Sequence, residues 1–208
     1  MTEKTRKIVV ATTNPGKIAE LRAMLDLNVE WHGLDDFENI SDIEETGDTF
    51  AENARIKALG YAKQTGLWTI ADDSGLVVDA LDGAPGVKSA RFSGQKMNDR
   101  TLLDHKNMIK VLELLKDVPT AERTARFLCR LCLAGPDNLL IETEGILEGI
   151  IAEKECGQNG FGYDPIFFVP ELEKTVAQLT PDQKNAISHR GNAIRKLKPL
   201  LAAMLETA

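Results

Sequence analysis

The chain is poor in cysteine, in positive charge and in long apolar stretches. It has 3 cysteines among 208 residues, and 25 Lys and Arg against 32 Asp and Glu give a formal net charge of -7. No stretch approaches the roughly 18 apolar residues of a membrane span, and residues 1–7 carry no apolar signal core. These absences favour a cytoplasmic protein with free thiols, and they argue against a membrane protein, a disulfide-stabilised secreted domain and a nucleic-acid binder.

Two of the cysteines, Cys129 and Cys132, form a CxxC pair inside the stretch ARFLCRLCLAG. The alternation of this stretch predicts a strand, in which residues three apart point to opposite faces. We therefore expect neither a zinc site nor a redox pair.

Strand-like and helix-like patterns alternate along the chain. KIVVAT and LWTIA predict short buried strands, and DTFAENARIKALGYAKQTG between them predicts a helix. RTARFLCRLCLAG and NLLIETEGILEGIIA predict long neighbouring strands joined by a turn. The interleaving favours the α/β class with a mixed sheet. Near the C-terminus, Pro199 predicts a kink or break in a last helix.

The stretch TTNPGKIAEL begins a helix in an unusual way. Asn14 and Pro15 suit its cap and first position, but Gly16 in a helix costs about 1 kcal/mol relative to alanine. Lys17 places a cation at the positive end of the helix dipole. Backbone N–H groups at a helix start bind phosphate, and a nearby lysine adds charge. The stretch thus indicates either a phosphate site, although not a Walker A loop, or a solvated turn with a tolerated glycine.

Two acid pairs are candidates for metal binding and proton transfer. Glu44 and Glu45 precede a predicted helix, and Asp72 and Asp73 follow LWTIA, where we expect the strand to end. Ligands of α/β proteins bind at the carboxyl ends of strands, and Mg²⁺ requires only a few carboxylates. Because neighbours on an extended chain point oppositely, Asp72 and Asp73 should have different roles. We favour a functional role for Asp73 and a turn-forming role for Glu45.

Further polar groups allow two interpretations. Asn53 and Lys57 share a helix face, which either points into a cleft or is solvated. In GFGYDP, Phe161 either stacks on a base or joins the core, and Asp164 either accepts a ring N–H or belongs to a glycine-rich turn.

ISHRG places Ser188, His189 and Arg190 at a predicted helix start, one turn after Lys184. Their donors suit a carbonyl oxygen or phosphates. A Ser–His–acid hydrolase is disfavoured because no GxSxG elbow is present.

Five stretches together resemble one family. They are ATTNPGKIAEL, EETGDTFAENARIKA, ADDSGLVVDALDGAPGVKSARFSG, GFGYDPIFF and AISHRGNAIRKL, and the match runs from about Ile8 to Leu197. The chain is similar to the inosine/xanthosine triphosphate pyrophosphatases. The resemblance implies a curved mixed β-sheet flanked by helices, with residues 1–208 forming one two-lobed domain around a central nucleotide cleft. It also implies a homodimer and Mg²⁺-dependent hydrolysis of ITP, dITP or XTP to the nucleoside monophosphate and pyrophosphate.

The resemblance also assigns roles to residues of this sequence. Asp73 would be the general base and, with Glu44, a metal ligand. The phosphates would be held by Thr12, Thr13, Asn14, Pro15, Gly16 and Lys17. The remaining substrate contacts would be Ser74, Phe161, Gly162, Tyr163, Asp164, Lys184, His189 and Arg190. Of these, His189 and Arg190 would reach the nucleobase of the substrate.

Elementary chemistry agrees with this assignment. Phosphoryl transfer requires positioning and charge neutralisation, and fixed donors facing a 6-oxo purine would be left unpaired by adenine. Two other classes remain as alternatives. A non-catalytic nucleotide sensor would need no water-activating acid such as Asp73. A nucleotide-dependent kinase or ATPase would be expected to carry a Walker A loop or a kinase signature, and neither is present.

Overall fold

A computed structural model describes residues 5–207 of the chain. Within these residues, seven strands form one sheet in the order β2-β1-β3-β4-β5-β6-β7. β1 pairs in parallel with both β2 and β3, whereas β6 pairs antiparallel with β5 and β7. The α/β class and the mixed sheet flanked by helices are therefore confirmed.

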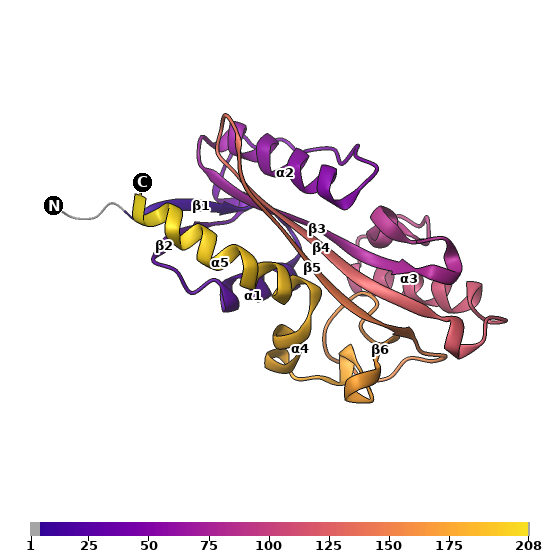
Figure 1. The fold of residues 1–208 in the computed structure, drawn as a ribbon. Helices are drawn as coiled ribbons and strands as arrows, with labels where there is room; N and C mark the ends of the chain where they lie inside the picture. Colours follow the sequence, from indigo (N-terminus) through magenta and orange to yellow (C-terminus); the bar gives the residue numbers. More distant parts are fainter. Residues whose placement is uncertain (1–4, 208) are drawn as a thin grey trace. The chain divides into compact units, whose positions relative to one another are not determined.

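The strands and helices have the following bounds. The strands are β1 Arg6–Val10, β2 Val29–His32, β3 Trp68–Val78, β4 Thr124–Ala134, β5 Leu139–Ile151, β6 Phe167–Val169 and β7 Lys174–Thr175. The helices are α1 Pro15–Met24, α2 Phe50–Thr65, α3 Arg100–Leu114, α4 Pro181–Ile187 and α5 His189–Thr207 (Figure 1). Short 3-10 turns include η3, Gly86–Arg91.

Local sequence signals define several helix ends, of which the one at Asn14 and Pro15 was expected. Asn14 caps α1 ahead of Pro15, Thr49 and Glu52 form a capping box on α2, and Gly66 ends α2 in the left-handed conformation at φ 69°. Pro199 is different, because α5 runs through it without ending. The predicted break is therefore wrong, and packing of Leu197 and Leu201 on the core favours a continuous helix there.

The described chain divides into two compact units, and each contains parts of β3, β4 and β5. The first unit comprises the chain up to Asp73, Cys129–Gly145 and the chain from Arg190 onward. The second comprises Ser74–Leu128 and Ile146–His189.

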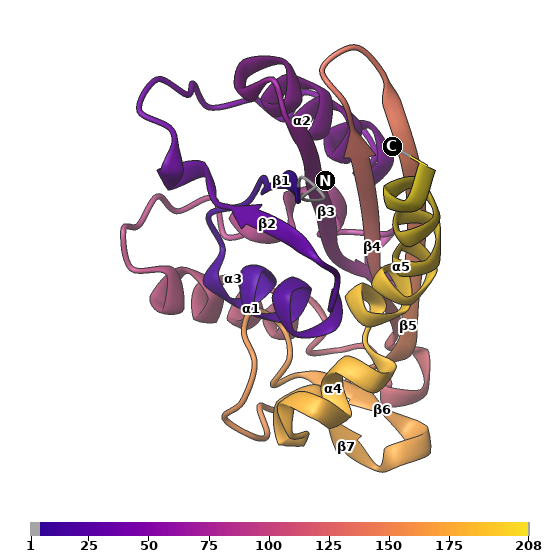
Figure 2. The same cartoon turned by 90° about the vertical axis from the view of Figure 1, so that its left-hand side faces the viewer.

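In the first unit, two apolar clusters cover opposite faces of the sheet. Ile8, Val10 and Ile70 pack with α1 and α5, whereas Val9 and Ala71 pack with α2 (Figures 1 and 2). This alternation is the two-residue period of buried strands.

The cysteines of β4 follow the same alternation. Cys129 belongs to the cluster under α1 and α5, and Cys132 to the cluster under α2. Their placement on opposite faces confirms the sequence prediction. Burial raises the pKa of each thiol to about 12, so both stay protonated and unreactive at neutral pH.

The second unit has its own core, in which α3 packs on the far halves of β3 and β4. Met108, Val111 and Leu115 contact Leu76 and Phe127 in one buried cluster. No helix within residues 5–207 has the length and apolar character needed to cross a membrane.

Candidate active site

The turn that begins α1 is closed by its own cap. The Asn14 side-chain oxygen accepts the N–H groups of Gly16 at 3.0 Å and Lys17 at 3.4 Å, and the Asn14 N–H donates to Thr12 Oγ1 at 3.2 Å. The first turn of α1 contains no acidic residue. Asn14 therefore caps the start of α1, and the first turn has no carboxylate to oppose a phosphate.

Lys17 extends from this turn to a buried carboxylate. Its Nζ lies 2.9 Å from Asp72 Oδ2. Arg190 donates to the same oxygen through Nη2 at 3.0 Å and Nε at 3.3 Å, and its Nη1 contacts Glu20. Asp72 and Arg190 are both 1% exposed, so this charged chain lies inside the protein.

Mutual compensation stabilises the ionised forms of these groups. Burial alone would raise the pKa of Asp72, but Lys17 and Arg190 outweigh it and hold that pKa well below its usual range. Burial likewise opposes the charge of Arg190, and Asp72, Cys129 and Glu20 together raise its pKa. Because the Arg190 guanidinium is occupied by Asp72 and Glu20, these contacts favour a positioning role. The contact of Arg190 with the nucleobase of the substrate stays a prediction.

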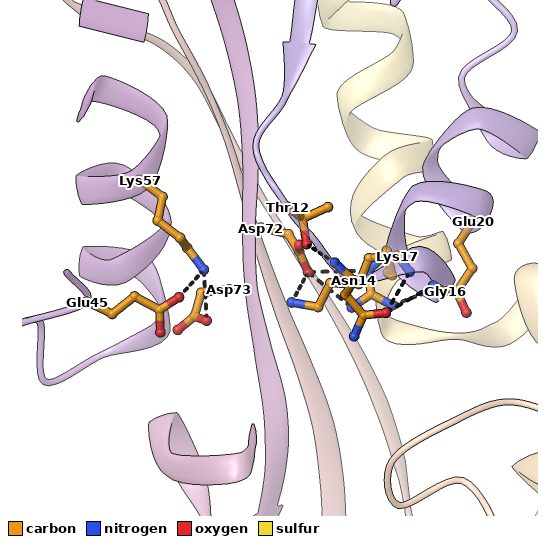
Figure 3. A network of polar contacts seen from close by, with 10 residues as sticks. Thr12, Asn14, Gly16, Lys17, Glu20, Glu45, Lys57, Asp72 and Asp73 are labelled. Atoms are coloured by element: carbon orange, nitrogen blue, oxygen red, sulfur yellow. Dashed lines mark hydrogen bonds and ion pairs between the residues drawn. The ribbon is translucent and has the colours of Figure 1, made fainter. Parts of the chain in front are cut away.

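Asp72 and Asp73 do not lie where the strand was expected to end. β3 continues through both acids to Val78, so the expectation of a strand ending at LWTIA is wrong. Acids and glycine are disfavoured in strands, and here each acid is compensated by cations from a different face. Figure 3 shows Asp72 beside Lys17 on one side of β3 and Asp73 beside Lys57 on the other. The expected division of the two acids between opposite faces is confirmed.

Asp73 shares an ammonium group with a second acid. Lys57 Nζ lies 3.3 Å from Asp73 Oδ1 and 2.7 Å from Glu45 Oε1 (Figure 3). Burial raises the pKa of Asp73, and Lys57 only partly offsets the effect. Burial also opposes the charge on Lys57, but Asp73, Asp72 and Glu45 prevail and raise its pKa. A carboxylate with a raised pKa beside a fixed cation suits a general base.

The neighbouring acid in this cluster is Glu45, although the sequence favoured a turn-forming role for it and assigned the metal to Glu44. Glu44 is exposed. Adjacent residues of an extended segment point in different directions, so only one of them faces Lys57. The interpretation of Glu45 as a simple turn residue is therefore wrong, and the role of Glu44 stays a prediction.

Asn53 holds the segment that carries these glutamates. It is fully buried, its Oδ1 accepts the Gly47 N–H at 2.8 Å, and its Nδ2 donates to the Gly47 oxygen at 3.2 Å. A Cβ on Gly47 would lie 2.9 Å from Asn53 Oδ1, so glycine permits this close approach. The shared α2 face of Asn53 and Lys57 is thus not a solvated one.

One oxygen of Asp73 fits a cation. Asp73 Oδ2 is buried and has no hydrogen-bond partner among residues 5–207. Within those residues, no three His, Cys, Asp or Glu side chains cluster as a ready-made metal site. Mg²⁺ often uses one or two carboxylates together with substrate phosphates, and Asp73 with a neighbouring glutamate meets that smaller need.

The second unit contains most of the other predicted substrate contacts. Lys184 Nζ lies 2.7 Å from Asp164 Oδ2 and 4.2 Å from the centre of the Phe161 ring. The Phe161 N–H donates to the same Asp164 oxygen at 2.9 Å. Asp164 and Lys184 are 3% and 7% exposed. The structure therefore brings these three residues together as one buried group.

The remaining predicted contacts of this unit have varied environments. The His189 ring stacks on Phe127, with centroids 4.8 Å apart and an interplanar angle of 24°. Tyr163 is buried, and its hydroxyl donates to the backbone carbonyl oxygen of Ser89 at 2.8 Å. Gly162 has φ 63°, a left-handed conformation that favours glycine. Ser74 is partly exposed on β3.

Three partners of these residues were missed or left open by the sequence. Lys57 had a helical spacing signal but no visible acid partner. Asp72 was visible only as part of a pair. Glu20 had no signal, because its partner Arg190 is 170 residues away along the chain.

Together, the fold and the site define an α/β protein in which lysines and acids are paired on both faces of one central strand. The sequence model of the Ham1 family matches residues 8–200. The dITP/XTP pyrophosphatase of Bacillus cereus is 48% identical over 94% of this chain and 95% of its own. The dITP/XTP pyrophosphatase of Listeria monocytogenes is 49% identical over 96% of this chain and 97% of its own. The chain belongs to the Ham1 family.

Solved structures agree with this assignment. A HAM1 protein from Coxiella burnetii superposes with a TM-score of 0.86 at 44% identity, covering 96% of this chain and all of that one. A nucleoside-triphosphatase, or dITP/XTP pyrophosphatase, from Mycobacterium abscessus has a TM-score of 0.75 at 45% identity, covering 93% and 99%.

Proposed function

We propose that this protein hydrolyses ITP, dITP and XTP to the nucleoside monophosphate and pyrophosphate, and so removes these nucleotides from the pool. Relatives that match nearly their whole length are named dITP/XTP pyrophosphatases. The single observation in the structure that carries the proposal is the buried carboxylate of Asp73, with its raised pKa, beside Lys57 and Glu45.

In this reaction, Asp73 orients a water molecule and accepts its proton as the water attacks the α-phosphorus. The bond between the α-phosphorus and the oxygen that bridges it to the β-phosphorus then breaks, and pyrophosphate leaves with the electrons of that bond. Lys57 fixes the Asp73 carboxylate in place, and Lys17 supplies positive charge to the phosphates from the start of α1. Lys184 and Phe161, fixed by Asp164, offer an ammonium and an aromatic face to the nucleobase.

Mg²⁺ is part of the proposal. Asp73 and one glutamate of the Glu44–Glu45 pair would hold it, and the free Oδ2 of Asp73 supports this choice. The ion would supply charge neutralisation on the polyphosphate. Glu45 is the better candidate of the two, because Lys57 joins it to Asp73.

The deciding experiment is a nucleotide panel with separate detection of pyrophosphate and orthophosphate. We expect pyrophosphate from dITP, ITP and XTP, almost none from ATP, and loss of all activity in EDTA with recovery on excess Mg²⁺. Orthophosphate as the first product would refute the proposal, because it requires cleavage of a different bond.

Two broader properties belong to the same proposal. We expect a homodimer, which sedimentation velocity would show as twice the chain mass, and a cytoplasmic location. A monomer that retains full activity would contradict the first of these.

A further inference from the structure

The segment GAPGVKSARFSG, residues 83–94, was given no role by the sequence, yet it contains a buried serine with an unusual set of contacts. Ser89 lies in η3 and is 7% exposed. Its hydroxyl accepts the Leu76 N–H at 2.9 Å and donates to the Gly86 oxygen at 2.6 Å. Ser89 therefore ties η3 to the part of β3 that directly follows Asp73 and Ser74.

Gly75 makes this approach possible. A Cβ built on Gly75 would lie 2.2 Å from Ser89 Oγ and 2.9 Å from the Gly86 oxygen. Real Cβ atoms essentially never lie closer than 3.0 Å to such atoms. The proximity of η3 therefore requires glycine in the middle of β3.

The same serine also reaches the glycine-bearing loop. The Tyr163 hydroxyl donates to the Ser89 carbonyl oxygen at 2.8 Å, and Tyr163 is 5% exposed. Tyr163 lies between Phe161 and Asp164, two of the predicted substrate contacts. One residue thus joins β3, beside the predicted base, to the loop predicted to contact the nucleotide.

The rest of the segment is fixed by α3. Asn107, 1% exposed, donates to the Ala90 oxygen at 3.2 Å and accepts the Ser93 N–H at 2.7 Å. Lys110 Nζ donates to the Phe92 oxygen at 2.8 Å. Residues 90–93 are therefore held independently of Ser89, so loss of the Ser89 hydroxyl would act on β3 rather than unfold the segment.

We infer that Ser89 is a positioning residue for the hydrolytic reaction. Its hydroxyl fixes the Ser74–Leu76 stretch of β3, and its carbonyl oxygen fixes Tyr163 and hence the Phe161–Asp164 loop. Ser89 itself is buried and would act through Leu76 and Tyr163. The inference rests on the proposed function, and it matters because a displacement of about 1 Å at a reacting group reduces rates by up to roughly 100-fold.

The test begins with Ser89→Ala and a matched control, Ser93→Ala. The Ser93 hydroxyl lies in the same segment, and its hydrogen bond to the Gln95 N–H is long, at 3.4 Å. Pyrophosphate release from dITP is measured well below the unfolding temperature of each variant. We expect Ser89→Ala to lose about 10- to 100-fold in kcat/KM, mostly in kcat, and Ser93→Ala to stay within about twofold of wild type.

A second pair of variants separates position from stability. Gly75→Ala should lower the unfolding temperature because its Cβ meets the Ser89 hydroxyl. Adding Ser89→Ala removes that atom but leaves the Ser89 Cβ at 2.8 Å and the Gly86 oxygen at 2.9 Å, so the double variant should regain only part of the unfolding temperature that Gly75→Ala loses. Its kcat/KM should nevertheless stay low, because the hydroxyl that holds Leu76 is still missing.

The outcomes distinguish the inference from the proposed function. If the wild type releases no pyrophosphate from dITP, ITP or XTP, the proposed function fails and the positioning role of Ser89 fails with it. If the wild type is active and Ser89→Ala keeps wild-type kcat and KM while unfolding at a lower temperature, Ser89 is only structural and the inference is overturned.

Discussion

Replacing Asp72 with asparagine tests how the buried charges around Lys17 are balanced. The substitution keeps the size of the side chain but removes the negative charge that Lys17 and Arg190 share. Removing one partner of a buried ion pair typically costs about 3–5 kcal/mol. Arg190 keeps Glu20, and the Lys17 side chain is 16% exposed and can be solvated. We therefore expect a loss nearer about 2–4 kcal/mol.

For a chain of this length, each kcal/mol corresponds to about 2–4 °C in Tm, so Asp72→Asn should lower Tm by roughly 4–16 °C. Lys17→Ala should have a smaller effect, because Asp72 keeps both nitrogens of Arg190 and the start of α1 loses an unfavourable cation. Asp79→Asn is a suitable control. Its ion pair with Arg126 is largely exposed, and such pairs contribute about 0–1 kcal/mol.

The pH dependence gives an independent check. The pKa of Asp72 is lower in the folded protein than in the unfolded chain, so its ionisation stabilises the fold above the unfolded pKa of about 4. That contribution is lost as the pH falls toward the folded pKa. The Tm difference between wild type and Asp72→Asn should therefore be constant near neutrality and shrink below about pH 4. A difference that is independent of pH, or no larger than that of Lys17→Ala, would refute this account of the network.

Three further substitutions address the other charged groups. Asp73→Asn should abolish pyrophosphate release, retain nucleotide binding by calorimetry in the absence of Mg²⁺, and hold or raise Tm at pH 7, because the raised pKa means that ionised Asp73 opposes folding; pyrophosphate release at the wild-type rate would contradict its role as a general base. Lys57→Met should lower kcat and should lower Tm more at pH 7 than at pH 4, because Asp73 and Glu45 lose their shared cation; equal losses would show that packing dominates. Lys184→Met should raise KM for dITP about 10-fold or more, the usual value of a charge-assisted contact, and an unchanged KM would place Lys184 outside the substrate site, as a partner of Asp164 alone.

The sequence predicted those parts of the fold that depend on neighbouring residues. The cap of α1 at Asn14 was visible because it is determined within a few residues. The opposite orientations of Cys129 and Cys132 followed from the two-residue period of a strand.

The parts it missed depend on contacts between distant segments. β3 was expected to end early because acids and glycine are poor strand formers, and only Lys17, Lys57 and the proximity of η3 explain why they occur there. Glu44 and Glu45 are chemically identical, so the sequence could not show which one faces Lys57. The partners of Arg190 were not visible, because Glu20 and Asp72 lie far from it in sequence.

The adjacency of Asp72 and Asp73 makes β3 sensitive to its reading frame. A shift of one residue in a strand exchanges its two faces. A single deletion before Asp72 would therefore deliver each acid to the wrong set of cations, even though the composition of the strand had hardly changed. Both faces of the strand are anchored by separate apolar clusters, through Ile70 on one side and Ala71 on the other. The register of β3 therefore restricts the number of residues in this strand as well as their identity. Loop insertions elsewhere should be tolerated far better than any insertion between Trp68 and Asp73.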